Sequence, residues 1–451
     1  MAQFLLFILL FFSSLGYSQF GPIQIIDESE MSSGIKKIIT ADMDHDGLED
    51  IVVAQGFNVG HIGVYRNNGD GSFSDKIIAD ALTATPNSVA VADLNLDGWK
   101  DIVTMSQTMN EIVWLPSQNG NFSERIVIDN DVVFCNAVAA TDFDTNGSPD
   151  FVAIGQHFIN FYRNNGNGTF NKEPILTTAT SPNVLECMYL ETADFNNDGH
   201  PDLLTAETLG GVIYLNNGHG IFTPSVFTTD GFIATLAHAF DANNDSFTDA
   251  LVLTSTGQIN LYLNNGNGNM TFHSTAFSVS GSALRSLQTA DMNGDGFADI
   301  LAAVNFKAKA YLSNGNNTFG SELIVHQDSG IFITEVAVAD LDQDQIPEYL
   351  WSGANHTLAY QKNTLLGISE NPQFLMALFP NPASEKIVLK NAGKQNLNVT
   401  IYNASGQRLL TKTGSETLDF NVSSLANGLY FIQISTHNDP KTNQVLKFIK
   451  E

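Results

Sequence analysis

The sequence of 451 residues predicts an all-β protein, a seven-bladed β-propeller followed by a small Ig-like β-sandwich. A short motif of aspartate, asparagine and glycine recurs seven times, and its copies begin 47 to 52 residues apart. Runs of small and β-branched residues flank the copies, and the repeats lack the 3.6-residue period of a helix. Four short strands in about 50 residues, separated by Gly, Asn and Asp turns, are typical of a propeller blade.

The order of elements is the same in each repeat. An apolar run such as residues 88–92 leads into the acidic motif, and a second run such as residues 50–54 follows it. A Tyr-x-Asn-Asn-Gly turn such as residues 65–69 ends the third strand, and a Gly-x-Phe sequence opens the fourth, as at Phe122.

The seventh repeat lacks a fourth strand of its own, because it stops near Asn363. The segment that begins at Phe20 resembles the fourth strand that follows Phe122 in the second repeat. We therefore predict that the first strand of the mature chain completes the last blade and leaves no open sheet edge at the seam.

The repeated motif predicts a calcium site. Carboxylates and amides recur at positions 1, 3, 5 and 9, counted from the first aspartate, and Ca²⁺ prefers six to eight oxygen ligands. An Asp-Gly hairpin turn is the alternative for one loop, but a plain turn does not need four oxygen-bearing positions in every copy. These positions hold 23 of the 48 Asp and Glu residues, and such crowded carboxylates repel one another unless a cation is present.

The predicted ligands, for loops 1 to 7 in chain order, are Asp42, Asp44, Asp46 and Asp50; Asp93, Asn95, Asp97 and Asp101; Asp142, Asp144, Asn146 and Asp150; Asp194, Asn196, Asp198 and Asp202; Asp241, Asn243, Asp245 and Asp249; Asp291, Asn293, Asp295 and Asp299; and Asp340, Asp342, Asp344 and Glu348. Up to seven Ca²⁺ ions are expected. Loops 5 and 7 are expected to bind most weakly, because Ser246 replaces the position-6 glycine in loop 5, and Gln345 and Glu348 alter loop 7.

The repeats across residues 20–365 resemble those of the FG-GAP/VCBS family, the calcium-loop blades also found in the propeller of integrin alpha subunits. This resemblance implies the propeller fold. It does not specify an activity, because such propellers serve in adhesins, in lectins and beside polysaccharide-degrading enzymes.

The start of the chain predicts export. Residues 4–12 form an unbroken apolar run, and small residues follow up to Ser18, as in a secretory signal peptide. The predicted divisions are a signal peptide at 1–18, the propeller at 19–365, a linker at 366–375 and a C-terminal domain at 376–451. No other stretch reaches transmembrane length, so no integral membrane span is expected.

The C-terminal segment alternates apolar and polar residues over short strands, which predicts a small antiparallel sandwich. Its Phe-Pro-Asn-Pro sequence at 379–382, its turn from Tyr402 to Gly406 and its Leu-x-x-Gly-x-Tyr pattern at 425–430 resemble the C-terminal sorting domain of the type IX secretion system. A generic Ig-like binding domain is the alternative. The resemblance implies that the type IX machinery is a partner and that the protein is secreted or lies on the outer surface of a Gram-negative bacterium.

Charge and motif content exclude several function classes. The formal net charge of −28 argues against nucleic acid or an anionic membrane as partner. No serine-hydrolase elbow, zinc-protease motif, phosphate loop or dinucleotide fingerprint occurs. Glu191, His238 and Gln288 share one repeat position near the expected axis. We interpret them as the polar lining of a wet channel; the alternative is that they act as acid–base groups. Cys135 and Cys187 also share one repeat position. They are expected to be two buried thiols or, alternatively, to form a disulfide between neighbouring blades.

We therefore expect a calcium-binding propeller that acts as a non-catalytic binding or adhesion module for a glycan or protein ligand. The alternative is an enzyme or enzyme subunit that acts on polysaccharide, with its chemistry in the propeller channel. The ligand is expected on the face of the 2–3 turns and blade-to-blade connections, because these segments differ most between repeats. Phe57, His157 and Phe158 are candidate contacts there.

Overall fold

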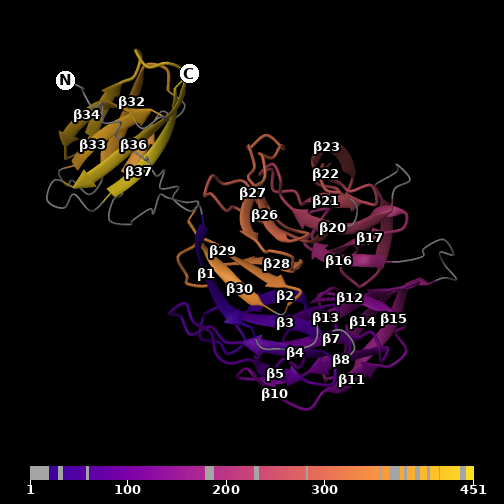
Figure 1. The fold of residues 1–451 in the computed structure, drawn as a ribbon. Coiled ribbons are helices and arrows are strands. Elements are labelled where there is room, and N and C mark those ends of the chain that lie inside the picture. Colours follow the sequence, from indigo (N-terminus) through magenta and orange to yellow (C-terminus); the bar gives the residue numbers. More distant parts are fainter. Residues whose placement is uncertain are drawn as a thin grey trace, which may run out of the picture. The chain divides into compact units, whose positions relative to one another are not determined.

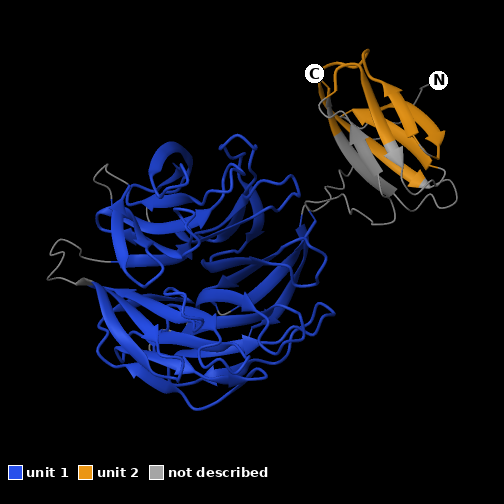
Figure 2. Cartoon of the chain, turned by 180° about the vertical axis from the view of Figure 1, so that it is seen from behind, with its two compact units in different colours: residues 1–365 blue, residues 366–451 orange. Residues whose placement is uncertain are grey.

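A computed structural model of the chain describes residues 20–28, 34–56, 60–177, 187–227, 233–280, 283–355, 357–364, 376–379, 383–391, 397–403, 407–415, 417–436 and 443–450. The predicted signal peptide, the predicted linker and Phe57 lie outside the described residues. The described part of the chain consists of strands and turns without a helix, which confirms the all-β class. The chain divides into two compact units, Met1–Leu365 and Leu366–Glu451 (Figure 2).

Unit 1 contains seven four-stranded antiparallel sheets, and six of them use strands in chain order (Figure 1). Blades 1 to 3 contain β2 (Ile35–Ala41), β3 (Asp50–Gly56), β4 (Gly60–Tyr65) and β5 (Ile77–Asp80); β6 (Val89–Ala92), β7 (Asp101–Ser106), β8 (Glu111–Leu115) and β11 (Ile126–Asp129); and β12 (Cys135–Thr141), β13 (Asp150–Gly155), β14 (Phe158–Asn164) and β15 (Phe170–Thr177). The ribbon of β9 (Ser117–Gln118) and β10 (Asn121–Phe122) extends the 3–4 turn of blade 2.

The next three blades repeat this arrangement. Blades 4 to 6 contain β16 (Cys187–Ala193), β17 (Asp202–Glu207), β18 (Gly210–Asn216) and β19 (Phe222–Val226); β20 (Ala234–Phe240), β21 (Asp249–Thr254), β22 (Gln258–Asn264) and β23 (Met270–Ser278); and β24 (Leu284–Ala290), β25 (Asp299–Val304), β26 (Lys307–Tyr311) and β27 (Leu323–Gln327).

Blade 7 joins the two ends of the repeat region. Its sheet contains β28 (Ile333–Ala339), β29 (Glu348–Gly353), β30 (Leu358–Asn363) and, as the fourth strand, β1 (Phe20–Asp27). Phe20 pairs with Asn363, as Phe122 pairs with Ser117 in blade 2. The prediction that the first strand completes the last blade is therefore confirmed.

The seven blades form a closed ring. The first strand of each blade contacts the first strand of the next, and β2 of blade 1 contacts both β6 of blade 2 and β28 of blade 7. Seven apolar clusters fill the junctions, each with residues from two neighbouring blades. Strand β3 shows how one strand serves two junctions, because Ile51 and Val53 pack against blade 7 while Val52 and Ala54 pack against blade 2. The second strands are therefore continuous apolar runs.

Unit 2 is a sandwich of two antiparallel sheets, as the sequence predicts. One sheet contains β31 (Met376–Phe379), β32 (Lys386–Asn391) and β35 (Thr417–Asn421), and the other contains β34 (Arg408–Gly414), β33 (Leu397–Asn403), β36 (Gly428–Thr436) and β37 (Asn443–Lys450). Alternate residues such as Leu389, Phe420, Ile401 and Ile432 meet in one buried core.

Closure of the ring depends on the first strand, which yields a test of the fold. Phe20 is 6% exposed and packs edge-on against Tyr349, with ring centroids 5.2 Å apart. We expect Phe20→Ala to lower the free energy of unfolding by roughly 3–5 kcal/mol, because it opens a cavity at the seam. Phe272→Ala is the control, since Phe272 lies on the outermost strand of blade 5 and is 55% exposed. Equal urea midpoints for the two variants would contradict the closure.

Candidate metal centres and channel cluster

The seven acidic loops connect the first and second strands of their blades, and all share one backbone conformation. Position 4 is left-handed in His45, Leu96, Thr145, Asn197, Asn244, Gly294 and Gln343, and position 6 is left-handed in Gly47, Gly98, Gly147, Gly199, Ser246, Gly296 and Gln345. The glycine at position 6 predicted a sharp turn there from the sequence. Position 4 has no common residue type, so its left-handed conformation could not be predicted. Ser246 and Gln345 adopt the same turn at a cost of about 1–2 kcal/mol each, because their Cβ atoms crowd the following carbonyl.

Side-chain oxygens at positions 1 and 5 hold the loops in their turn. In loop 2, Asp97 N donates to Asp93 Oδ1 over 3.1 Å and Gly98 N donates to Asp93 Oδ2 over 2.9 Å. Trp99 N donates to Asp97 Oδ1 over 2.9 Å. The loop backbone thus turns its N–H groups toward these side chains, which fixes where their oxygens lie.

The carboxylate at position 9 is buried and anchors the loop to the blade. In loop 3, Phe143 N donates to Asp150 Oδ2 over 3.1 Å, and Asn164 N, at the end of the third strand, donates to Asp150 Oδ1 over 2.7 Å. Burial, reinforced by the nearby Asp144, raises the pKa of Asp150 to about 7 although the backbone N–H groups oppose the rise. Burial likewise raises the pKa to about 6 in Asp50, Asp101, Asp202, Asp249 and Asp299, and to about 7 in Glu348.

The donor set of the loops suits a hard divalent cation. Carboxylate oxygens lie within 4.8 Å of one another in three groups: Asp42, Asp44 and Asp50; Asp142, Asp144 and Asp150; and Asp340, Asp342 and Asp344. Asp42 Oδ1, Asp44 Oδ1 and Asp342 Oδ1 are buried without a hydrogen-bond donor. Buried anionic oxygens without a donor are costly unless a cation compensates them. The residues therefore fit Ca²⁺, whereas the expected weakness of loops 5 and 7 stays a prediction.

An asparagine near the end of the third strand connects most of the loops to the following blade, a role that the sequence did not reveal. Asn164 Nδ2 of blade 3 donates to Leu94 O, at position 2 of loop 2, over 2.8 Å. The same bond joins Asn67 to Leu341, Asn216 to Phe143, Asn264 to Phe195 and Asn363 to Met292. Five of the seven junctions are tied in this way.

A polar cluster lies where the first strands of blades 4, 5 and 6 meet. His238 Nδ1 lies 2.9 Å from Glu191 Oε1, and His238 Nε2 lies 2.9 Å from Thr289 Oγ1. Burial opposes ionisation of Glu191, but His238 and the Ala239 N–H hold its pKa below the usual range. Two predicted residues thus come together, while Thr289 takes the place expected for Gln288. An imidazole between a carboxylate and a hydroxyl can relay a proton, and the same contacts join three blades.

Two charged residues near this cluster were missed by the sequence analysis. Lys37 Nζ of blade 1 lies 3.4 Å from Glu335 Oε1 of blade 7, so this ion pair spans the seam of the ring. Burial opposes the charge on Lys37, but Tyr189, Glu335 and Glu191 raise its pKa. Both residues stand five positions before the first aspartate of their loops, but the residue type there varies among the blades, so internal comparison of the repeats did not single them out.

The remaining sequence candidates are also placed by the structure. Cys135 and Cys187 are buried free thiols, which matches the first of the two alternatives for them. His157 lies in the turn between β13 and β14 with a φ of 70°, and Phe158 begins β14 half-buried.

Comparisons with known proteins agree with this architecture. The FG-GAP-like repeat model matches residues 42–104, 142–205, 194–252 and 241–302. The model of the secretion system C-terminal sorting domain matches residues 377–451. No curated protein matches the chain significantly in sequence.

Solved structures share the fold at low sequence identity. A lectin of Agrocybe aegerita that recognises non-reducing terminal N-acetylglucosamine is 19% identical, with a TM-score of 0.51 over 66% of this chain and 81% of its own. BBS1N, solved in complex with ARL6DN, is 10% identical, with a TM-score of 0.53 over 77% of this chain and 97% of its own. An extracellular domain assigned to a one-component system of B. thetaiotaomicron is 11% identical, with a TM-score of 0.50 over 94% of this chain and 53% of its own.

The fold, the acidic loops and the tail together define a secreted β-propeller with a sorting domain for the type IX secretion machinery. The chain belongs to the FG-GAP-like repeat family. Among the described residues, no helix is long and apolar enough to cross a membrane.

The amide tie between blades yields a stability prediction. Asn164 is 1% exposed, and its Nδ2 also donates to Pro149 O over 2.9 Å. We expect Asn164→Ala to lower the free energy of unfolding by about 1–3 kcal/mol, because one buried and one partly buried carbonyl lose their donor. Asn165→Ala is the matched control, since this neighbouring side chain is exposed and its hydrogen bonds, to Thr169 and from Asn171, stay within its own blade. The measurement is chemical denaturation of both variants. Equal free energies of unfolding for the two would show that the Asn164 hydrogen bonds do not stabilise the protein.

Proposed function

We propose that the protein is a calcium-stabilised propeller that acts outside the cell, or on the outer surface of a Gram-negative cell, as a non-catalytic binding or adhesion module. Calcium is supported by the buried carboxylate oxygens without donors and by the recurrence of one loop conformation in all seven blades. In this proposal the loops stabilise the disc, and the ligand, a glycan or a protein, contacts another surface.

The two faces of the disc differ in a way that supports this division. The 2–3 turns and the blade-to-blade connections share one face, here called the connector face, because they are hydrogen bonded to each other. Gln156 N donates to Phe134 O over 3.1 Å and Ser255 N donates to Ile233 O over 2.8 Å. The acidic loops and the 3–4 turns share the opposite face, here called the loop face, since the position-9 carboxylates join them.

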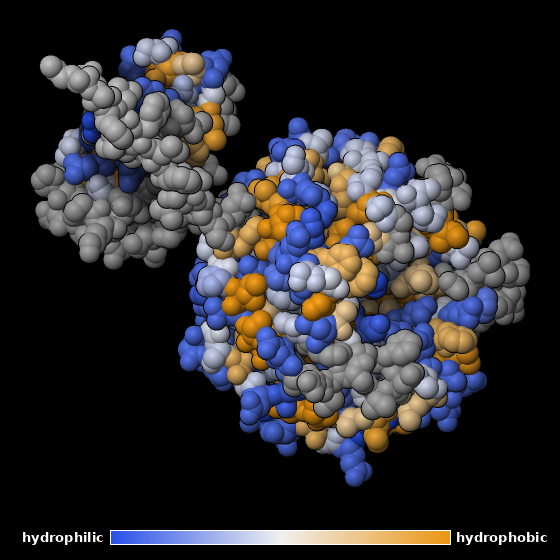
Figure 3. Space-filling view, viewed as in Figure 1, coloured by the Kyte–Doolittle hydropathy of each residue, from blue (hydrophilic) through white to orange (hydrophobic). Residues whose placement is uncertain are grey.

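Exposed large apolar side chains gather on the connector face, and this is the observation that carries the proposal. Those described on the connector face are Leu82, Met109, Val133, Phe134, Leu209, Ile233 and Phe332. On the loop face the corresponding side chains are Leu96 and Ile221. Apolar residues also form separate patches among polar ones in the view of Figure 3. Exposed apolar groups with polar neighbours favour a recognition surface.

A glycan is the ligand class to test first. Aromatic and apolar side chains displayed on loops of a rigid scaffold are suited to sugar rings as well as to proteins. The lectin with the same fold recognises N-acetylglucosamine, which supports this choice by analogy of fold.

A polysaccharide-active enzyme is the second candidate, and it rests on one observation. Glu191, His238 and Thr289 form a continuous chain of contacts suited to proton transfer. Incubation with polysaccharide pools and a reducing-end assay tests this alternative, with His238→Gln as the variant that removes the relay. Activity that His238→Gln abolishes in a folded protein would favour the enzyme over the binding module.

Removal of calcium gives the first test of the proposal. Because each ion binds a loop that forms only in the folded state, chelation is expected to lower the melting temperature of the propeller. Asp97→Ala should remove a smaller part of that difference, because it disables one loop. Serine replacement of the exposed Asp70, which lies in a 3–4 turn, is the control for a lost carboxylate. Identical melting temperatures in EDTA and in millimolar Ca²⁺ would show that the loops are only turns.

Substitutions on the two faces test where the ligand binds. The probes are a glycan array and a panel of extracellular matrix proteins. We expect a variant with Met109→Ser, Phe134→Ser and Leu209→Ser to lose at least tenfold in affinity for whatever probe binds, the loss expected when apolar contacts leave an interface. Leu96→Ser with Ile221→Ser is the matched variant on the loop face. A loss confined to the loop-face variant would place the site on the wrong side of the disc.

A further inference from the structure

The residue at position 3 divides the seven loops into two groups. It is aspartate in loops 1, 3 and 7, and asparagine in loops 2, 4, 5 and 6. A second position varies with it. In each blade one residue at the end of the third strand, or shortly after it, pairs with a Phe or Met at or shortly before the start of the fourth strand. The second position is the residue immediately before the one at the third strand. The equivalent pairs that define this position are Asn67 with Phe73, Ser117 with Phe122, Asn164 with Phe170, Asn216 with Phe222, Asn264 with Met270, Ser313 with Phe319 and Asn363 with Phe20.

The second position is basic wherever position 3 is aspartate. The three blades with aspartate have Arg66, Arg163 and Lys362 there, and the four blades with asparagine have Pro116, Leu215, Leu263 and Leu312. A basic residue therefore stands at the second position in every blade with a position-3 aspartate, and in no blade with a position-3 asparagine.

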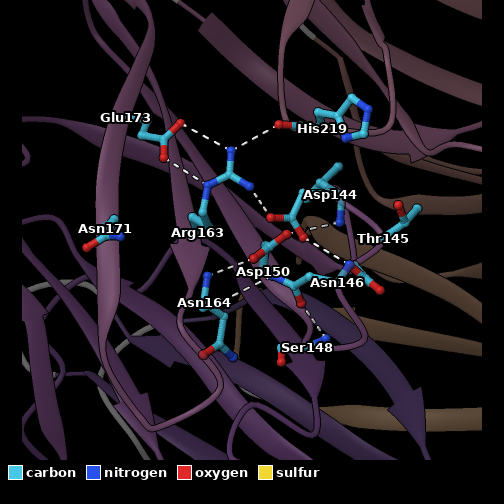
Figure 4. Close-up of polar contacts among 12 residues, drawn as sticks. Asp144, Thr145, Asn146, Ser148, Asp150, Arg163, Asn164, Asn171, Glu173 and His219 are labelled. Carbon is cyan, nitrogen blue, oxygen red and sulfur yellow. Dashed lines mark hydrogen bonds and ion pairs between the residues drawn. The ribbon is translucent and has the colours of Figure 1, made fainter.

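The base contacts the position-3 aspartate in each of the three blades. Figure 4 shows the Arg163 guanidinium between Asp144, with which its Nη1 forms an ion pair, and Glu173, whose Oε1 lies 2.9 Å from its Nε. The third nitrogen, Nη2, donates to His219 O of blade 4 over 3.0 Å. Arg66 is placed alike, with Nε 3.5 Å from Asp44 Oδ2 and Nη2 donating to Asn119 O of blade 2 over 2.9 Å.

The contact leaves one carboxylate oxygen of the position-3 aspartate turned toward the loop. Asp144 Oδ1 accepts from Asn146 N over 3.2 Å, as Asn95 Oδ1 accepts from Asp97 N over 3.0 Å in loop 2. Asp44 Oδ1 and Asp342 Oδ1 are buried without a donor, while their Oδ2 atoms face Arg66 and Lys362. An aspartate with its base thus presents a single oxygen, as an asparagine does.

The base also equalises the charge of the loops. At positions 1, 3, 5 and 9, loops 1 and 7 hold four carboxylates, and the other five hold three. The base reduces loops 1 and 7 to three net negative charges. Loop 3 reaches the same value when Arg163 and its second partner Glu173 are both counted.

We propose that Arg66, Arg163 and Lys362 are positioning residues that hold one oxygen of the position-3 aspartate and balance its charge, so that all seven loops offer a divalent cation a similar site. This inference rests on the proposed calcium binding. Residues that bind a metal ligand from outside the site orient that ligand and tune the affinity for the metal.

Loop 1 allows the inference to be tested with terbium alone as the probe. Trp99, at position 7 of loop 2, stacks on His45 of loop 1 with ring centroids 4.4 Å apart, so its sensitised luminescence reports on these two loops. The variants are Asp44→Asn, Arg66→Leu and the double variant, which gives loop 1 the residues of loops 4, 5 and 6. Loop 2 contributes the same signal to each of them. Lys309→Leu is the control, because Lys309 pairs with Glu322 on the outer strands of blade 6.

The two single substitutions are expected to act in opposite directions. Asp44→Asn should weaken terbium binding about tenfold, because it leaves the guanidinium without its carboxylate, and Arg66→Leu should strengthen it several-fold, because it removes a repelling charge. In EDTA, Arg66→Leu should lower the melting temperature by a few degrees, because four carboxylates are then uncompensated. The double variant should return to within about threefold of the parent affinity, with its melting temperature largely restored.

The outcomes separate this inference from the proposal on which it depends. If the parent protein gives no sensitised luminescence and Ca²⁺ leaves its melting temperature unchanged, calcium binding itself is wrong. If the parent binds but the melting temperature of the double variant in EDTA falls by the sum of the two single shifts, or its terbium affinity is weaker than that of either single variant, the charge-balancing role is overturned. Equal effects of Lys309→Leu and Arg66→Leu would also overturn it.

Discussion

The buried carboxylate at position 9 is the group on which each blade depends. Asp50, Asp101, Asp150, Asp202, Asp249 and Asp299 are fully buried, and Glu348 nearly so. An ionised carboxylate in such a place is stable only if hydrogen-bond donors surround it. Those donors are the N–H of loop position 2 and the N–H that ends the third strand, so the carboxylate fixes the loop against the sheet. The carbonyl of position 2 accepts the asparagine amide of the next blade at five of the seven junctions, which extends the constraint from blade to blade.

Much of this architecture could be predicted because it is repeated. A single acidic loop is ambiguous, but seven copies separate positions that must carry oxygen from positions that vary. The repeat also exposed the missing fourth strand of blade 7, and Phe20 supplies it in the expected register. The left-handed conformation at position 4 gave no such signal, because His45, Leu96 and Thr145 all tolerate it. A backbone constraint that many side chains accept leaves no pattern in the sequence.

Contacts between blades were the part that repetition could not reveal. In the polar cluster, a side chain on one first strand reaches one position further along the first strand of the next blade. Glu191 thereby meets Ala239, and His238 meets Thr289. By the same rule the residue opposite Gln288 is Val338, whose side chain offers no polar partner, so Gln288 does not extend the cluster. Lys37 and Glu335 are nearly 300 residues apart, and only closure of the ring brings them together.

The two faces of the disc are under different constraints, and this difference bears on function. On the loop face, each acidic residue must satisfy a backbone donor, a neighbouring base or a cation, so few positions there can change without loss of stability. The connector face lacks this constraint. Its connections need only to return the chain to the axis and to form backbone hydrogen bonds with the 2–3 turns. Side chains such as Phe134 and Met109 can therefore vary with the ligand while the disc stays the same. In the function proposed above, calcium bound on the loop face would add rigidity that supports recognition on the connector face.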